Sequence, residues 1–195
     1  MKELEGKKIG FALCGSFCTL ARVFDPIKQL IDNGAEIFPI MSSNAYSIDT
    51  RFGNAKDFVK RLEDLTGHKV QTKIEETEPI GPKRLYDMLV VAPCTGNTLG
   101  KLANAITDTG VLMAIKATLR NGQPVVIAIA TNDGLALNFK NFGTLMNTRN
   151  VYFVPFGQDN HVTKKNSLVA KMDLIYDTVI EAFDGRQKQP ILIQY

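Results

Sequence analysis

The sequence predicts a doubly wound α/β fold, in which a mostly parallel sheet carries helices on both faces. Short, continuous apolar segments alternate along the chain with longer segments whose apolar residues recur every three or four positions. The short segments are typical of strands buried on both faces, and the longer ones indicate amphipathic helices. Strands that alternate with helices form parallel sheets. No linker or repeat divides the 195 residues, so we expect one domain over residues 1–195.

Five segments are expected to be strands, and a sixth is a weaker candidate. Proline has no N–H for a central ladder, so Pro39 puts its strand at an end or at a sheet edge. The weaker candidate covers residues 70–74. The five strands are expected at residues 9–13, 36–41, 85–92, 124–130 and 151–154.

Helices are expected between these strands. The first helical region, from Phe17 to Ile31, is either one kinked helix or two short ones, because Asp25 and Pro26 are typical of an N-cap and a first helical position. Residues 75–83 are polar, contain two prolines and suggest a loop or broken helix. The other helices are expected at residues 55–65, 99–106, 109–119, 134–146 and 168–183. The tail at 190–195 is unexpectedly apolar, so it either packs on the core or binds a partner.

Composition and charge exclude several classes of protein. The formal net charge is +3 and the basic residues are scattered, which argues against nucleic-acid binding. No apolar run reaches the roughly 18 residues of a membrane span, and residues 1–8 before the first strand do not have the apolar core expected of a signal peptide. Three cysteines fit a reducing compartment, so we expect a cytoplasmic protein without disulfides.

Four polar loops follow the predicted strands and form the candidate binding site. In open α/β sheets, ligands bind at the carboxyl ends of the strands where the strand order reverses. Glycine lets a ligand approach the backbone, and helix N-termini favour anions such as phosphate. One such loop alone is most simply a turn with a helix cap. The four loops lie at residues 14–16, 42–44, 93–98 and 131–134.

The loops suit a mononucleotide such as FMN better than a dinucleotide. The first loop contains Gly15 but no G-x-G-x-x-G fingerprint, and no acidic residue follows the second strand at Met41. A P-loop motif is also absent. His68 and His161 are expected to be surface residues, and Cys14 and Cys18 lack the further ligands of a metal site. We therefore expect no metal, and a cofactor would have to supply the chemistry.

The motifs resemble the homo-oligomeric flavin-containing cysteine decarboxylases of the flavoprotein family. Residues 93–98 read PCTGNT, which is similar to the P-A-S-A-N-T signature of that family. The first strand with its Gly15 turn, and the segment 41–45, are similar to two further flavin-binding parts. The match covers roughly residues 7–150. The resemblance implies FMN held between subunits of an oligomer, with contacts from Gly15, Ser16, Ser42, Thr95, Asn97 and Thr98, and with Thr131 and Asn132 closing the site.

The sequence departs from the family at the decarboxylation machinery. Pro79 takes the place of the histidine upstream of the signature, and it has no titratable group. The family's P-x-M-N-x-x-M clamp matches residues 130–136, where the proline and both methionines are absent and Asp133 replaces the asparagine. No late cysteine follows Cys94. We therefore expect no decarboxylation of cysteine-terminated substrates.

Within the family, the whole chain resembles a subunit that works with a larger partner subunit to oxidise a small dihydro-dicarboxylate. Three hypotheses stay open: an oxidoreductase subunit that uses flavin or the partner's nicotinamide, a non-catalytic scaffold subunit, and a decarboxylase for another substrate. The catalytic residues are unknown. Candidates for a base are Asp108, Asp133 and His161, and candidates for binding a dicarboxylate are Lys101, Lys140 and Arg149.

Overall fold

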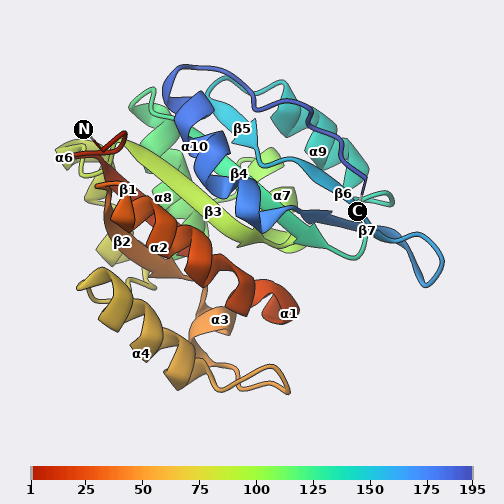
Figure 1. Cartoon of the computed structure of the whole chain (residues 1–195), viewed down its shortest axis with the longest axis horizontal. Coiled ribbons are helices and arrows are strands. Elements are labelled where there is room, and N and C mark those ends of the chain that lie inside the picture. Colours follow the sequence, from red (N-terminus) through yellow and green to blue (C-terminus); the bar gives the residue numbers. More distant parts are fainter. Residues whose placement is uncertain (1, 195) are drawn as a thin grey trace.

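The structure is a computed structural model that describes residues 2–194, so Met1 and Tyr195, the last residue of the apolar tail, lie outside it. A twisted sheet crosses the centre of the molecule, with α2 (Phe24–Asp32) and α10 (Ile175–Phe183) on one face and α7 (Gly96–Ala103) and α8 (Gly110–Arg120) on the other (Figure 1). The predicted doubly wound fold is confirmed. The expectation of a single domain stays a prediction.

The strand order of the sheet reverses between the first and the third strand of the chain. The sheet order is β2-β1-β3-β4-β7-β6, and β5 also pairs with β4. The chain moves from β1 outward to β2 and then returns to the other side of β1 as β3. The strands are β1 Lys8–Leu13, β2 Glu36–Met41, β3 Met88–Cys94, β4 Val125–Thr131, β5 Val151–Phe153, β6 Phe156–Asn160 and β7 Lys164–Ala170.

The remaining helices are short apart from α4. The first helical region consists of two helices, α1 and α2, joined by the 3-10 turn η1, so the two-helix alternative is confirmed. The expected cap at Asp25 is wrong, because α2 already begins at Phe24. These elements are α1 Phe17–Leu20, η1 Ala21–Val23, α3 Ser43–Ser47, α4 Ala55–Thr66, α5 Ile74–Thr77, α6 Ile80–Lys83, α9 Phe139–Met146 and η2 Met172–Leu174.

The core lies on both faces of the central strands. Every residue of β3 is buried, and so is every residue of β1 except Lys8. β2 is the edge strand that Pro39 predicts, although Gln71 forms one isolated bridge to Ile40 beyond it. That bridge is all the strand structure at residues 70–74, so the weaker sixth strand is wrong.

The C-terminal third differs most from the sequence prediction. The helix expected at 168–183 is wrong, since its first part belongs to the antiparallel strand β7 and only residues 175–183 form α10. Leu168, Met172 and Ile175 match helical spacing, yet Leu168 pairs with both Thr131 of β4 and Gln158 of β6. Pairing with two strands outweighs local periodicity here. The helix expected at 134–146 begins only at Phe139.

The β6–β7 hairpin extends the sheet beyond the end of β4. β4 pairs with β5 along its first half and with β7 at its last two residues, Ala130 and Thr131. The hairpin turn projects from the body of the molecule (Figure 1). The apolar tail pairs with the outer edge of β6, where the Phe156 N–H donates to Ile191 O at 2.9 Å and the Ile193 N–H donates to Phe156 O at 3.0 Å. The tail therefore packs on its own sheet. No helix in residues 2–194 is long and apolar enough to cross a membrane.

Candidate ligand pocket at the strand ends

A pocket of about 510 Å³ lies at the carboxyl ends of β1, β3 and β4, beside the reversal of strand order. Its volume falls within the roughly 300–1,000 Å³ typical of sites for small molecules and cofactors. The loops after these three strands and the β6–β7 hairpin form its walls. Its lining residues are Gly15, Ser16, Phe17, Cys18, Thr19, Phe52, Thr95, Gly96, Asn97, Ala130, Thr131, Asn132, Asp133, Asn138, Asp159, Lys164, Ser167 and Val169.

The loop after β3 turns directly into α7 and points the start of that helix at the pocket. Thr95 is the N-cap, and its Oγ1 accepts a hydrogen bond from the Thr98 N–H at 3.3 Å. The first N–H groups of a helix have no partner within it and favour anions. Both Gly96 and Asn97, the first two helical residues, line the pocket. The start of α7 therefore offers N–H donors to a ligand.

Gly96 packs against the loop that follows β4. A Cβ atom at Gly96 would lie 2.5 Å from Thr131 Oγ1, 2.6 Å from Asn138 Nδ2 and 2.8 Å from Asp133 Oδ1. Contacts under 3.0 Å require a shift of the neighbours, so only glycine fits here without displacing them. This close approach joins the loops after β3 and β4 into one wall.

A chain of hydrogen bonds fixes the polar side chains behind Gly96. The Thr131 hydroxyl donates to Asp133 Oδ1 at 2.5 Å, and Asn138 Nδ2 donates to Asp133 Oδ2 at 2.7 Å. Asn141 Nδ2 donates in turn to Asn138 Oδ1 at 2.9 Å. Both oxygens of the Asp133 carboxylate are thereby oriented by neutral donors.

The β6–β7 hairpin supplies the opposite wall. Lys164 Nζ lies 2.6 Å from Asp159 Oδ2, and the hydrogen bond to this carboxylate raises the pKa of Lys164. Ser167 Oγ donates to Thr131 O at 3.2 Å and fastens the hairpin to β4. Lys164 is the one cationic side chain among the lining residues of the described chain.

The predicted site residues separate into two groups. Six of them, Gly15, Ser16, Thr95, Asn97, Thr131 and Asn132, line the pocket, whereas Ser42 and Thr98 do not. Ser42 Oγ accepts from the Ala45 N–H at 3.3 Å and caps α3. The Thr98 side chain is buried, and its Oγ1 lies 3.3 Å from Cys14 Sγ. These two hydroxyls therefore stabilise the loops behind the pocket.

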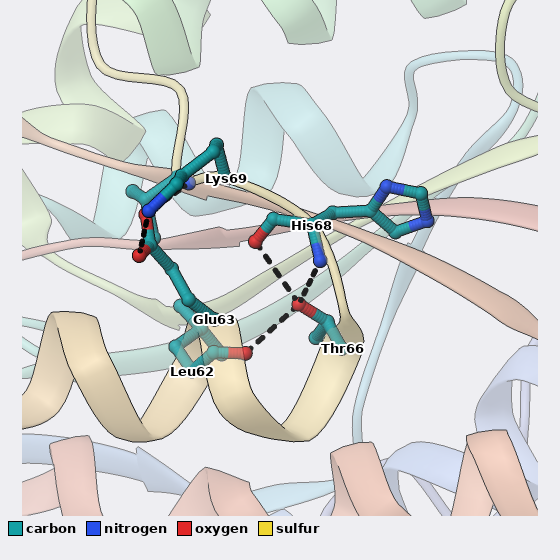
Figure 2. Close-up of polar contacts among 6 residues, drawn as sticks. Leu62, Glu63, Thr66, His68 and Lys69 are labelled. Carbon is teal, nitrogen blue, oxygen red and sulfur yellow. Dashed lines mark hydrogen bonds and ion pairs between the residues drawn. The ribbon is translucent and has the colours of Figure 1, made fainter.

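The other candidate residues lie elsewhere. His68 follows the end of α4, and its N–H donates to Thr66 Oγ1. Its ring forms a hydrogen bond with Glu36. Figure 2 shows this turn beside the Glu63–Lys69 pair. His161 is exposed in the hairpin turn. Lys101 binds Asp108 at 2.5 Å, and neither residue lines the pocket.

The remaining candidates also lie outside the pocket lining. Lys140 and Arg149 are exposed, and Pro79 occupies the N-cap position of α6 without a side-chain hydrogen bond. Within residues 2–194, no group of three or more His, Cys, Asp or Glu residues is arranged to hold a metal.

Sequence reasoning missed the lining residues that belong to the hairpin. Asp159, Lys164 and Ser167 reach the pocket only because β7 pairs with the end of β4. Phe52, another missed residue, reaches it from the connection between α3 and α4. The segment 164–170 reads KKNSLVA and shows no strand alternation, and the helical spacing of Leu168, Met172 and Ile175 favoured a helix instead.

Known proteins resemble this chain over its whole length. A family model described as Flavoprotein matches residues 1–183. The B subunit of dipicolinate synthase from Bacillus subtilis (strain 168) is 51% identical over 194 residues, which cover 100% of this chain and 97% of the relative. The crystal structure of the dipicolinate synthase B subunit from Bacillus halodurans superposes with a TM-score of 0.90 at 44% identity, covering 98% of each chain. The FMN-dependent cysteine decarboxylase SpaF has a TM-score of 0.70 at 21% identity, covers 93% of this chain and 97% of its own, and shares the fold.

Proposed function

The chain belongs to the Flavoprotein family, and we propose that it is the B subunit of a dipicolinate synthase. In this proposal it acts with the larger A subunit of the synthase to oxidise a dihydrodipicolinate-type precursor to dipicolinate during spore formation. The observation that carries the proposal is the 51% identity to the Bacillus subtilis protein over the full chain. The partner, the oxidation and the cytoplasmic location are parts of the proposal.

The pocket fits FMN by the chemistry of its side chains. FMN combines one phosphate, a chain of hydroxyls and a flat aromatic ring. The pocket offers the N-terminus of the eight-residue helix α7, the hydroxyls of Ser16 and Thr95, and the apolar side chains of Phe17 and Phe52. Its volume of about 510 Å³ suits a ligand of this size. The donors are neutral amides and hydroxyls, which suit a mononucleotide.

We assign the FMN contacts to the predicted residues that line the pocket. Gly15, Ser16, Thr95 and Asn97 would hold the cofactor, and Thr131 and Asn132 would close the site. Ser42 and Thr98 would act indirectly, because they stabilise the loops that carry these contacts. When bound, FMN would supply a two-electron acceptor.

The same pocket suits a small dicarboxylate substrate at its hairpin side. Lys164 is the lining cation, and an incoming carboxylate would compete with Asp159 for it. We also propose that the chain forms a homo-oligomer around the flavin, as the family resemblance implies.

The assay measures dipicolinate formation from its dihydro precursor with this chain alone, with only the A subunit, and with both. We expect turnover only in the mixture. Turnover at the full rate with only the A subunit present would reduce this chain to an accessory, and full turnover by this chain alone would contradict the need for a partner. Release of carbon dioxide from a cysteine-terminated substrate would favour a decarboxylase instead.

FMN binding is tested separately from activity. FMN added at about 100 times its dissociation constant should stabilise the fold by roughly 2.7 kcal/mol. The melting temperature with and without FMN measures this effect. An unchanged melting temperature at high micromolar FMN, together with turnover of the two-subunit complex, would indicate a scaffold role without flavin.

A further inference from the structure

Asp133 is a pocket carboxylate that forms no ion pair within the described residues 2–194. Two carboxylates line the pocket, and Asp159 is paired with Lys164 on the hairpin. The hydrogen-bond donors to Asp133, by contrast, are the neutral Thr131 hydroxyl and Asn138 amide. A carboxylate oxygen accepts about two hydrogen bonds, so each oxygen of Asp133 keeps acceptor capacity for a ligand.

The side chain of Asn138, at the start of α9, is oriented toward Asp133. Asn138 occupies the N-cap position of α9, yet its side chain makes no cap hydrogen bond. An ionised carboxylate only accepts, so Asn138 must present its Nδ2 to Asp133 and its Oδ1 to Asn141 Nδ2. Asn138 is 9% exposed, which leaves its amide little freedom to turn. The Asn138 backbone is in the αR region rather than extended, and its side chain is turned to Asp133 instead of capping α9.

Close packing places this network against Gly96 in the lining of the pocket. The Gly96 backbone, at the start of α7, leaves no room for a Cβ atom between itself and Thr131, Asn138 and Asp133. The carboxylate thus lies next to the loop to which we assign FMN contacts. A substrate held between that loop and the hairpin would lie within reach of Asp133.

We propose that Asp133 is the proton acceptor of the oxidation, and that Asn138 and Asn141 are its positioning residues. This inference rests on the proposed function. The dihydro ring loses a hydride from one ring atom, and the hydride carries its electron pair to a flavin or nicotinamide acceptor. The neighbouring ring atom loses a proton, which forms an O–H bond at Asp133. The electron pair of that broken bond becomes the new double bond of the aromatic ring.

The first test is the variant Asp133→Asn in the complex with the A subunit. Asparagine keeps the size of the side chain but does not accept a proton at neutral pH. We expect kcat to fall by about 10²-fold or more, in the range found for lost general bases. KM and the FMN-induced shift in melting temperature should change little. Asp108→Asn is the matched control, because Asp108 pairs with Lys101 away from the pocket and should keep the wild-type rate.

A double variant separates proton transfer from structure. In Asp133→Asn with Asn138→Asp, the carboxylate moves one position along the network while charge and hydrogen bonding are kept. Its aspartate can still accept from Asn141 and from the new asparagine. The melting temperature should therefore return toward the wild-type value while kcat stays low.

Chemical rescue gives an independent readout. The smaller side chain of Asp133→Ala leaves space for formate, and added formate should restore part of kcat only if a missing base limits the rate. The proposal is supported if the wild-type complex turns over, kcat falls in Asp133→Asn and does not recover in the double variant, and formate restores part of kcat in Asp133→Ala. Wild-type turnover with an unaffected Asp133→Asn, or full recovery of kcat in the double variant, would overturn it while the proposed function stands. No dipicolinate from the wild-type complex would refute the proposed function and this inference with it.

Discussion

The hydroxyl of Thr98 lies 3.3 Å from the sulfur of Cys14, and this contact joins the first turn of α7 to the end of β1. The two residues are 84 positions apart in the chain. They meet where the strand order reverses, and their chain neighbours Gly15 and Asn97 line the pocket. Burial raises the pKa of the Cys14 thiol, so the sulfur stays a neutral partner at physiological pH.

Replacing Thr98 by valine should lower the free energy of unfolding, and it should affect ligand binding less. Valine keeps the shape but removes the buried Thr98 hydroxyl, which also lies 3.1 Å from Oγ1 of the half-buried Thr95. Lost buried hydrogen bonds typically cost about 1–3 kcal/mol. Urea unfolding measures the loss. Thr163→Val, at an exposed turn position, is the control and should change stability by less than about 0.5 kcal/mol.

Two glycine-to-alanine changes should have opposite effects. At Gly96 the new methyl group would meet Thr131, Asn138 and Asp133 at 2.5–2.8 Å, and we expect a loss of about 1–3 kcal/mol together with weaker FMN binding. At Gly143, within α9, the new Cβ would meet no atom within 4 Å beyond its chain neighbours and its own helix backbone, so alanine should stabilise the helix by about 0.5–1 kcal/mol. Thermal melts with and without FMN compare the two. Equal behaviour of both variants would argue against the tight wall around Gly96.

The sequence could predict the parts of the site that local patterns encode. Gly15, Thr95 and Thr131 follow strands with long apolar runs, so their place at one edge of the sheet could be inferred from the chain alone. Lys164 and Asp159 could not, because only the antiparallel pairing of β7 with the end of β4 brings them there. A sequence also does not reveal whether a hydroxyl faces a cavity or is turned inward. The family resemblance implied FMN contacts from Ser42 and Thr98, whereas the Ser42 hydroxyl caps α3 and the Thr98 hydroxyl is buried beside Cys14.

Glu76 should make the fold sensitive to acid. The N–H groups of Lys73 and Thr72 donate to its carboxylate at 2.9 and 2.7 Å and hold its pKa below the ordinary value of 4.5. A group with a lowered folded pKa stabilises the fold above its unfolded pKa, and this stabilisation is lost as the pH falls through the folded value. When the pH falls from about 6 to about 3, a range that spans the ordinary pKa of Glu76 and values below it, the Glu76→Gln variant should therefore lose less stability than the wild type. Urea unfolding at both pH values tests this, with Glu75→Gln as the exposed neighbouring control.

The tail should stabilise the edge of β6. Ile193→Pro removes the N–H that donates to Phe156 O, and proline in a paired strand disrupts the ladder. We expect a loss on the order of 1–2 kcal/mol. Leu192→Ala, at a side chain that is 69% exposed, should have little effect.

Deletion of residues 190–195 should lower the melting temperature and promote aggregation through the uncovered edge. A deletion variant with the wild-type melting temperature that only fails to bind the A subunit would instead assign the tail to the partner.

Cys18 should report directly on occupancy of the pocket. It is the exposed cysteine of the three and lines the pocket, whereas Cys14 and Cys94 are buried and their thiol pKa values are raised by burial. The thiolate is the reactive form, so a thiol reagent at about pH 8 should modify Cys18 rapidly and the other two only on unfolding. FMN should slow the rapid phase in proportion to its binding, and the Cys18→Ser variant should lack that phase. A rapid phase that persists unchanged at saturating FMN would place the cofactor away from this pocket, and rapid labelling of all three thiols would contradict the burial of the strand ends.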